Sequence, residues 1–165
     1  MILILCGVSG SGKSTIGQLL ASRLGWPFLD ADDYHPAANR HKMASGIALT
    51  DKDREPWLNA LHQRMREIAE SGGSALLACS ALKQKYRDLL ASGFAPGEVR
   101  FALLEAPREL IAERLRSRSH AFMNPDLLDS QLATLEQPAD AWRVSVRGTV
   151  EQSVAQLLSY LSAGA

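Results

Sequence analysis

Eight residues near the start of the chain have the types and spacing that bind a phosphate group. They are Gly7, Val8, Ser9, Gly10, Ser11, Gly12, Lys13 and Ser14, which fit the pattern G-x-x-x-x-G-K-[ST]. Glycines permit backbone angles closed to other residues, so successive N–H groups can turn inward around phosphate oxygens. Lys13 adds a mobile cation for the β- and γ-phosphates, and Ser14 adds a hydroxyl ligand for the Mg²⁺ of a nucleotide. The pattern predicts that this segment, here called the phosphate loop, binds a nucleoside triphosphate.

The residues on either side of the phosphate loop predict the elements that position it. Met1 to Cys6 is a short apolar run of the kind found in fully buried parallel strands. After the loop, apolar residues recur at helical spacing, which predicts a helix from about Lys13 to Gly25, with Pro27 just beyond. The start of this helix adds unpaired N–H donors that favour an anion.

Acidic residues follow the next predicted strand. Pro27 to Asp30 is expected as a buried strand whose carboxyl end delivers Asp30, Asp32 and Asp33. In an open parallel sheet, ligands bind beyond the carboxyl ends of the strands, so these carboxylates are expected to face the same crevice as the phosphate loop. Three acids in four residues are also an ordinary turn composition, and the local pattern leaves both interpretations open.

Basic residues near the same strand ends indicate the kind of phosphoryl acceptor. A third predicted strand, Ala75 to Cys79, leads into Ser80 to Lys83. The candidate cations are His35, Lys42, Arg54, Lys83 and Arg87. Cations suit a carboxylate, and the Asp32 carboxylate suits hydroxyl groups, so the set favours a small polyhydroxylated acid. Spacing alone does not choose among such acids.

A pair of arginines ends a later helix, which Pro107 opens. Arg114 and Arg118 are four residues apart and therefore lie on one helix face. Such a pair is usually a solvated face, but beside a bound triphosphate it can clamp the transferring phosphoryl group. The small polar residues from Ser119 to Pro125 predict a mobile lid over about residues 117–127.

The chain as a whole alternates strands and helices. The remaining strands are predicted at Val99 to Leu104 and Trp142 to Val146, and the remaining helices at His35 to Gly46, Pro56 to Gly72, Gln84 to Ala91, Asp126 to Leu135 and Val150 to Leu161. Thr50 and Asp53, before the second of these helices, have capping-box spacing. Five strands alternating with helices predict a three-layer α/β fold with a parallel sheet, as one domain over residues 1–165.

Composition and charge narrow the function. Eighteen basic and eighteen acidic residues cancel without a run of like charge, which argues against nucleic acid or a membrane surface as a partner. No stretch approaches the roughly twenty apolar residues of a membrane helix. Cys6 and Cys79 are expected to be buried, reduced thiols of a cytoplasmic protein. For a chain of this size, these features favour phosphoryl transfer to a small molecule over a motor or a switch.

Several separated motifs resemble the gluconate kinases, which are P-loop kinases related to shikimate and adenylate kinases. The motifs are GVSGSGKST (7–15), FLDADDYHP (28–36), NRHKMASGIALTDKDREPWL (39–58), CSALKQKYRD (79–88) and LLDSQLATLEQP (127–138). Many kinases share the first motif, whereas the middle three together favour gluconate over shikimate. The resemblance implies ATP-dependent phosphorylation of D-gluconate to 6-phospho-D-gluconate, a sheet order of 2-3-1-4-5, and a homodimer.

The resemblance also implies roles for individual residues. Gly7 to Thr15 would hold the phosphates of ATP, and Ser14 with Asp30, through water, would hold Mg²⁺. Asp32 would orient or deprotonate the acceptor hydroxyl. The residues that would surround the sugar acid are His35, Lys42, Arg54, Ser80, Lys83 and Arg87. Arg114 and Arg118 would cover the nucleotide from the lid side, and Lys13, Mg²⁺ and Arg118 would contribute most to the rate.

The lid departs from the family pattern. It reads RSHAFM over residues 118–123, where family members read RKGHFM or close to it, so no role carries over to His120. The fifth strand lacks the acidic residues often present there, which leaves the adenine contacts open. Two alternatives remain: a kinase of another hydroxylated acid such as shikimate, and a nucleotide-binding module that transfers nothing.

Overall fold

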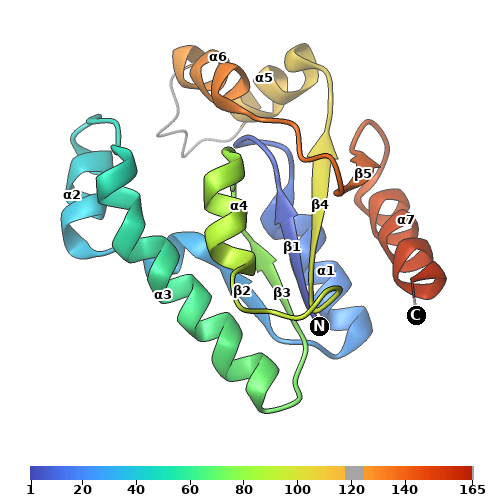
Figure 1. The fold of residues 1–165 in the computed structure, drawn as a ribbon. Coiled ribbons are helices and arrows are strands. Elements are labelled where there is room, and N and C mark those ends of the chain that lie inside the picture. The colour runs from blue at the N-terminus through green and yellow to red at the C-terminus, as the bar shows by residue number, and fades with distance from the viewer. Residues whose placement is uncertain (118–124, 165) are drawn as a thin grey trace.

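Five parallel strands form the sheet at the centre of the molecule, and the order β2-β3-β1-β4-β5 is the one that the resemblance implied (Figure 1). The computed structural model describes residues 1–117 and 125–164. The strands are β1 (Ile2–Cys6), β2 (Phe28–Asp30), β3 (Ala75–Ala78), β4 (Val99–Glu105) and β5 (Trp142–Ser145). Because β1 lies between β3 and β4, the loop that follows β1 emerges at the middle of the carboxyl edge.

Helices cover both faces of the sheet and its carboxyl edge (Figure 1). They are α1 (Lys13–Leu24), α2 (Ala37–Ala44), α3 (Asp51–Glu70), α4 (Gln84–Ala91), α5 (Arg108–Ser117), α6 (Pro125–Thr134) and α7 (Val150–Ala163), with a short 3-10 helix η1 (Ala31–Tyr34) after β2. Helices α3 and α4 pack on one face and α1 and α7 on the other, while α5 and α6 lie over the carboxyl edge. The predicted three-layer α/β fold is confirmed.

Alternation along β1 builds the two cores. Ile4 and Cys6 pack with residues of α3 and α4, whereas Leu3 and Leu5 pack with residues of α1 and α7. All four side chains are buried, and burial of a leucine or isoleucine stabilises the fold by roughly 1.5–3 kcal/mol. A strand covered on both faces needs a continuous apolar run, which explains why this segment could be identified as a central strand.

Two elements differ from their predicted form. Helix α3 begins at Asp51, not at Pro56, because the Thr50–Asp53 capping box forms and starts the helix. Pro56 therefore lies inside the helix. Strand β2 is half-buried, since it is the edge strand of the sheet.

The central part of the predicted lid, residues 118–124, lies outside the described residues. None of the described helices is long and apolar enough to cross a membrane.

Candidate active site

The phosphate loop turns sharply between β1 and α1. Gly7, Gly10 and Gly12 have φ angles of 136°, 81° and 96°, which side chains rarely allow. A Cβ atom on Gly10 would also lie 2.9 Å from Cγ of Leu115 in α5. Val8 is buried in the apolar cluster beneath α5 and α6. The loop is therefore fixed between the sheet and α5, and its glycines have the backbone angles that the spacing predicted.

Lys13 and Ser14 connect the loop to its surroundings. The Lys13 ammonium donates hydrogen bonds to the carbonyl oxygens of Gly7 and Val8, both at 3.0 Å. Burial lowers the pKa of Lys13, and the nearby Asp32 carboxylate opposes that shift. The Ser14 hydroxyl donates to Oδ2 of Asp30 at 2.8 Å. The end of β2 thus reaches the start of α1, as expected from the sheet edge.

Asp32 lies in η1, whose first turn is capped by Asp30 through a bond from the Asp32 amide to Oδ1 at 3.1 Å. Partial desolvation raises the pKa of the Asp32 carboxyl, the Asp30 charge raises it further, and Lys13 acts in the opposite direction. A carboxyl group with a raised pKa is a stronger proton acceptor when ionised. The structure brings this acid and the phosphate-loop lysine within electrostatic reach of each other.

His35 is a neutral side chain in this fold. It is 7% exposed and stacks on Trp57 with ring centroids 4.3 Å apart. Burial, and then the charges of Arg54 and Arg40, lower the pKa of His35 to about 4. Desolvation disfavours the charged ring, so the lowered pKa argues against the expectation that His35 supplies a cation. A neutral imidazole can still bond substrate hydroxyl groups.

Asn39 sets the orientation of the His35 ring. Its amide nitrogen donates to the carbonyl of Asp53 at 2.8 Å and lies 3.3 Å from Nδ1 of His35. Since the amide nitrogen is a donor, Nδ1 of His35 accepts and Nε2 carries the ring proton. The two carboxylate oxygens of Asp53 accept hydrogen bonds from the Lys42 ammonium, at 2.8 and 2.9 Å. The Asp53 carboxylate thus caps α3 and also forms an ion pair with Lys42, a predicted substrate cation.

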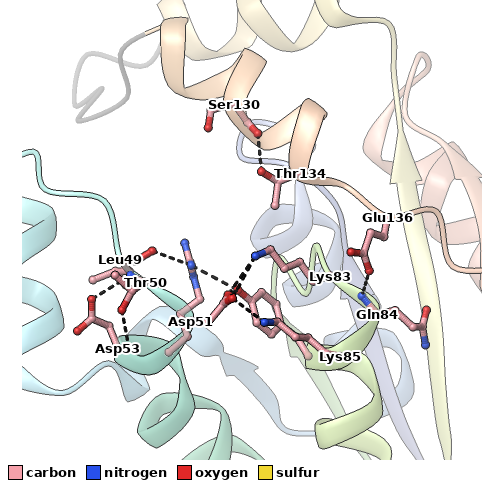
Figure 2. A network of polar contacts seen from close by, with 12 residues as sticks. Leu49, Thr50, Asp51, Asp53, Lys83, Gln84, Lys85, Ser130, Thr134 and Glu136 are labelled. Atoms are coloured by element: carbon pink, nitrogen blue, oxygen red, sulfur yellow. Dashed lines mark hydrogen bonds and ion pairs between the residues drawn. The ribbon is translucent and has the colours of Figure 1, made fainter.

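Asp51, the first residue of α3, gathers a second group of predicted residues (Figure 2). Its carboxylate accepts hydrogen bonds from Lys83 at 3.1 Å, from Lys85 at 2.5 Å and from the Tyr86 hydroxyl. These bonds lower the pKa of Asp51. The Arg54 guanidinium lies 3.4 Å from the same Tyr86 hydroxyl. The starts of α3 and α4 therefore hold Arg54 and Lys83 side by side.

Arg87 differs from its expected form. It is 2% exposed, and its guanidinium donates to oxygens of Ala81, Leu82, Gln84 and Glu136. The expectation that Arg87 offers a free cation is wrong, because these acceptors occupy its donors. Ser80 is half-buried, and its carbonyl oxygen accepts the Gly7 amide at 3.2 Å.

A cavity of about 210 Å³ opens beside the phosphate loop. Its lining includes Gly10, Thr15, Arg114 at the end of α5, and Gly148 and Thr149 in the turn before α7. Arg114 donates to the carbonyl oxygen of Val146 at 2.6 Å, also in that lining. Arg118, its predicted partner, lies outside the described residues. The turn before α7 carries no motif, so its place in this lining depends on tertiary packing.

Several other side chains of the site lie within the family motifs, but the sequence gave them no predicted role. Gln131 of α6 accepts the Ser9 amide at 2.8 Å and lies 3.3 Å from the Ser9 hydroxyl, although 122 residues separate them. Three more side chains join the site through hydrogen bonds. Asn39 bonds His35, one helical turn away, and the Tyr86 hydroxyl donates to Asp51, which is 35 residues away in the sequence. Cys6 and Cys79 are buried free thiols, as predicted, and burial raises their pKa values to about 11 and 12.

Comparison with known proteins places the chain in a family. Residues 2–138 match the family model described as AAA domain. A probable gluconokinase of Rattus norvegicus is 47% identical over 154 residues, covering 84% of this chain and 83% of the relative. The gluconokinase of Gluconobacter oxydans is 46% identical over 138 residues, covering 84% and 76%.

A solved structure agrees with these sequence relatives. The crystal structure of a gluconokinase from Sinorhizobium meliloti has a TM-score of 0.86 and 40% identity, and the match covers 98% of this chain and 91% of that one. Both the sequence and the fold match over nearly the whole chain. The chain therefore belongs to the gluconokinase family of P-loop kinases.

Proposed function

We propose that this protein transfers the γ-phosphoryl group of ATP to the 6-hydroxyl group of D-gluconate. Membership of the gluconokinase family supports the reaction. The structural observation that carries it is the contact between three segments at one sheet edge. The phosphate loop meets Asp30 of β2 and Ser80 after β3, so a donor and an acceptor bound there would be neighbours.

The residues beside the phosphate loop fit a magnesium ion. Mg²⁺ prefers hard oxygen ligands and retains several waters, and the Ser14 hydroxyl and Asp30 carboxylate, 2.8 Å apart, are such ligands. In the described part of the chain, no group of three or more His, Cys, Asp or Glu side chains could hold a metal ion. We propose, from the placement of these two oxygen ligands, that Ser14 and Asp30 hold Mg²⁺ together with the nucleotide, where it would neutralise phosphate charge.

The phosphate loop and Asp32 supply the chemistry of transfer. Lys13 would exchange its bonds to Gly7 and Val8 for phosphate oxygens, because an anion is the better acceptor for an ammonium group. Asp32 would accept the proton of the attacking hydroxyl group. Phosphoryl transfer depends mainly on positioning and charge neutralisation, so the lysine would contribute more to the rate than the base.

The base and ribose of ATP would enter the cavity beside Thr15, Arg114 and Thr149. The polar carbonyls and hydroxyls of this turn can bond a ribose or an adenine amino group. Arg118 would act on the transferring phosphoryl group from the lid, a role that stays a prediction from the sequence. The homodimer and the cytoplasmic location also stay predictions.

The sugar acid would lie between α2, α3 and the loop after β3. Its carboxylate would compete with Asp53 for the partly buried Lys42 and with Asp51 for Lys83, whose ion pair is more exposed and therefore weaker. His35 would bond a hydroxyl group as a neutral ring. This mixture of cations and a neutral donor suits a polyhydroxylated carboxylate better than an apolar acceptor.

A coupled assay of ADP release tests the reaction and the acceptor together. With the wild-type protein and ATP, we expect turnover with D-gluconate and little with shikimate or without an acceptor. Asp32→Asn keeps the shape but removes the base, so we expect kcat to fall by about 10²–10⁴-fold with KM for ATP nearly unchanged. Equal turnover of shikimate and gluconate would show that the proposed acceptor is wrong. ATP binding without any transfer would favour the alternative of a nucleotide-binding module.

A further inference from the structure

The loop between β3 and α4, residues 79–83, has an unusual backbone. Ala81 has a φ angle of 42°, the one positive φ angle of a non-glycine residue within residues 1–117 and 125–164. A side chain in this left-handed region is disfavoured because its Cβ crowds the backbone. Ala81 is also buried, at 1% exposure, between Ser80 and Leu82. Something outside the loop must stabilise this conformation.

Arg87 of α4 supplies that stabilisation. Nη1 donates to the carbonyl oxygens of Ala81 at 2.7 Å and Leu82 at 3.2 Å, and Nη2 donates to the carbonyl of Glu136 at 2.7 Å. Nε and Nη2 also donate to the Gln84 side chain at 3.2 and 2.8 Å. These contacts match the five N–H groups of a guanidinium, so none is left for a substrate.

Three further hydrogen bonds hold this loop and the first residue of α4 from other sides. The Glu136 amide donates to the Leu82 carbonyl at 2.8 Å, and the Glu136 carboxylate accepts the Gln84 amide at 2.5 Å (Figure 2). The Ser80 carbonyl accepts the Gly7 amide of the phosphate loop. These contacts hold the loop that carries Ser80 and Lys83 against the phosphate loop and Glu136.

We infer that Arg87 is a positioning residue that holds the strained loop of residues 79–83, through which it orients Ser80 and Lys83 toward the sugar acid. The inference rests on the proposed function for the nature of the substrate. It replaces the expected direct contact between Arg87 and the sugar-acid carboxylate. A buried guanidinium with every donor paired is well suited to this task, because loss of one partner leaves a costly unpaired charge.

A rescue experiment distinguishes positioning from direct contact. Arg87→Lys keeps the charge but cannot reach all of the acceptors, so we expect KM for gluconate to rise by about tenfold or more while KM for ATP changes less than about twofold. Glycine adopts the left-handed conformation without steric cost. In the double variant Arg87→Lys/Ala81→Gly, most of the loss in KM for gluconate should therefore be recovered, measured against Ala81→Gly alone.

The controls make each outcome decisive. Arg64→Lys, which alters an exposed arginine paired with Glu67, should leave both KM values unchanged. If the double variant stays as impaired as Arg87→Lys, or if Arg87→Lys leaves KM for gluconate unchanged, the positioning role is wrong. Should Arg87→Lys fail to fold, the milder Gln84→Leu removes two of the five contacts, and its smaller rise in KM for gluconate should be rescued by Ala81→Gly in the same way.

Amide hydrogen exchange separates this inference from the proposed function. Exchange in a peptide covering residues 79–84 should become about tenfold faster in Arg87→Lys and slow again in the double variant, because protection reports the local opening of the loop. This readout needs no substrate. If the wild-type protein did not phosphorylate gluconate, the proposed function would fail, while the exchange data would still test whether Arg87 holds the loop. Unchanged exchange in Arg87→Lys would show that Arg87 does not hold the loop.

Discussion

His35 makes the folded protein sensitive to mild acid. Its pKa is lowered to about 4 in the folded state, against an ordinary value near 6.5 in an unfolded chain. Between these values the unfolded chain binds a proton that the folded protein does not. The stability contributed by the neutral ring is therefore complete above about pH 6.5 and decreases as the pH falls toward 4.

We expect the free energy of unfolding to fall by about 2 kcal/mol between pH 7 and pH 5 on account of this one ring. Urea unfolding at the two pH values measures the fall. His35→Gln removes the titrating group, so the variant should lose about 2 kcal/mol less than the wild type over the same interval, whatever its stability at pH 7. Equal losses in the two proteins would show that His35 titrates normally.

At the scale of residues, the sequence predicted which side chains gather at the site but not their state of charge or their partners. Lys42, Arg54 and Lys83 are predicted as cations near the ends of strands, and the family resemblance implies that they surround the sugar acid. Asp51 lies within a family motif, but its role was not predicted, because its partners Lys83 and Lys85 are 32 and 34 residues away. Burial of Arg87 likewise depends on Glu136, which no local pattern links to α4.

At the scale of elements, two capping boxes begin the helices that border the site. Thr50 accepts the Asp53 amide at the start of α3, and Thr149 accepts the Gln152 amide at the start of α7. The first box also orients the carboxylate that pairs with Lys42. Thr149 lines the cavity beside the phosphate loop. A capped helix start therefore lies on each side of the site: that of α3 where the sugar acid would bind, and that of α7 where the nucleoside of ATP would bind.

Removal of either cap should destabilise the protein. Thr50→Ala and Thr149→Ala each remove one acceptor for a helix N–H group, so each should lower the free energy of unfolding by about 1 kcal/mol. Thr134 is a matched control, because its hydroxyl bonds the Ser130 carbonyl inside α6 and caps nothing. Thr134→Ala should change stability by less than about 0.5 kcal/mol. Denaturant unfolding would refute the assignment if all three variants behaved alike.

The start of α3 shows how far local pattern reaches. The sequence contained the correct cap, Thr50 with Asp53, but also a proline at position 56, and proline is favoured in a first helical turn. The structure keeps both, because the helix tolerates the missing N–H group of Pro56 where packing of Trp57 and Leu58 holds it in place. The capping box therefore sets where α3 begins, and the packing of its next residues accommodates the proline.

At the scale of the whole molecule, three loops from neighbouring strands converge on one crevice. Alternating strands and helices predicted the parallel sheet, but the order of its strands came from the family resemblance. Strand order depends on which helix covers which face, and that choice is made by contacts between distant segments such as β1 with β4. The periodicity of a single strand does not contain it.

Nucleotide binding should stabilise the whole fold. A non-hydrolysable ATP analogue with Mg²⁺, present at one hundred times its Kd, stabilises the folded state by about 2.7 kcal/mol. For a chain of this length we expect Tm to rise by about 5–10 °C in a thermal unfolding scan. Lys13→Ala should lose more than half of the rise, whereas Arg64→Ala should keep it. An equal rise in both variants would place the analogue away from the phosphate loop.

The hydrogen bond from the Gly7 amide to the Ser80 carbonyl joins the end of β1, which leads into the phosphate loop, to the end of the neighbouring strand β3. Residues 35–54 approach the crevice from beyond the edge of the sheet and take no part in that junction. A change of acceptor could therefore arise from substitutions in this segment and in the loop after β3 that it contacts through Lys83, while the nucleotide machinery stayed intact. Chimaeras between relatives that phosphorylate different acids would retrace such a history.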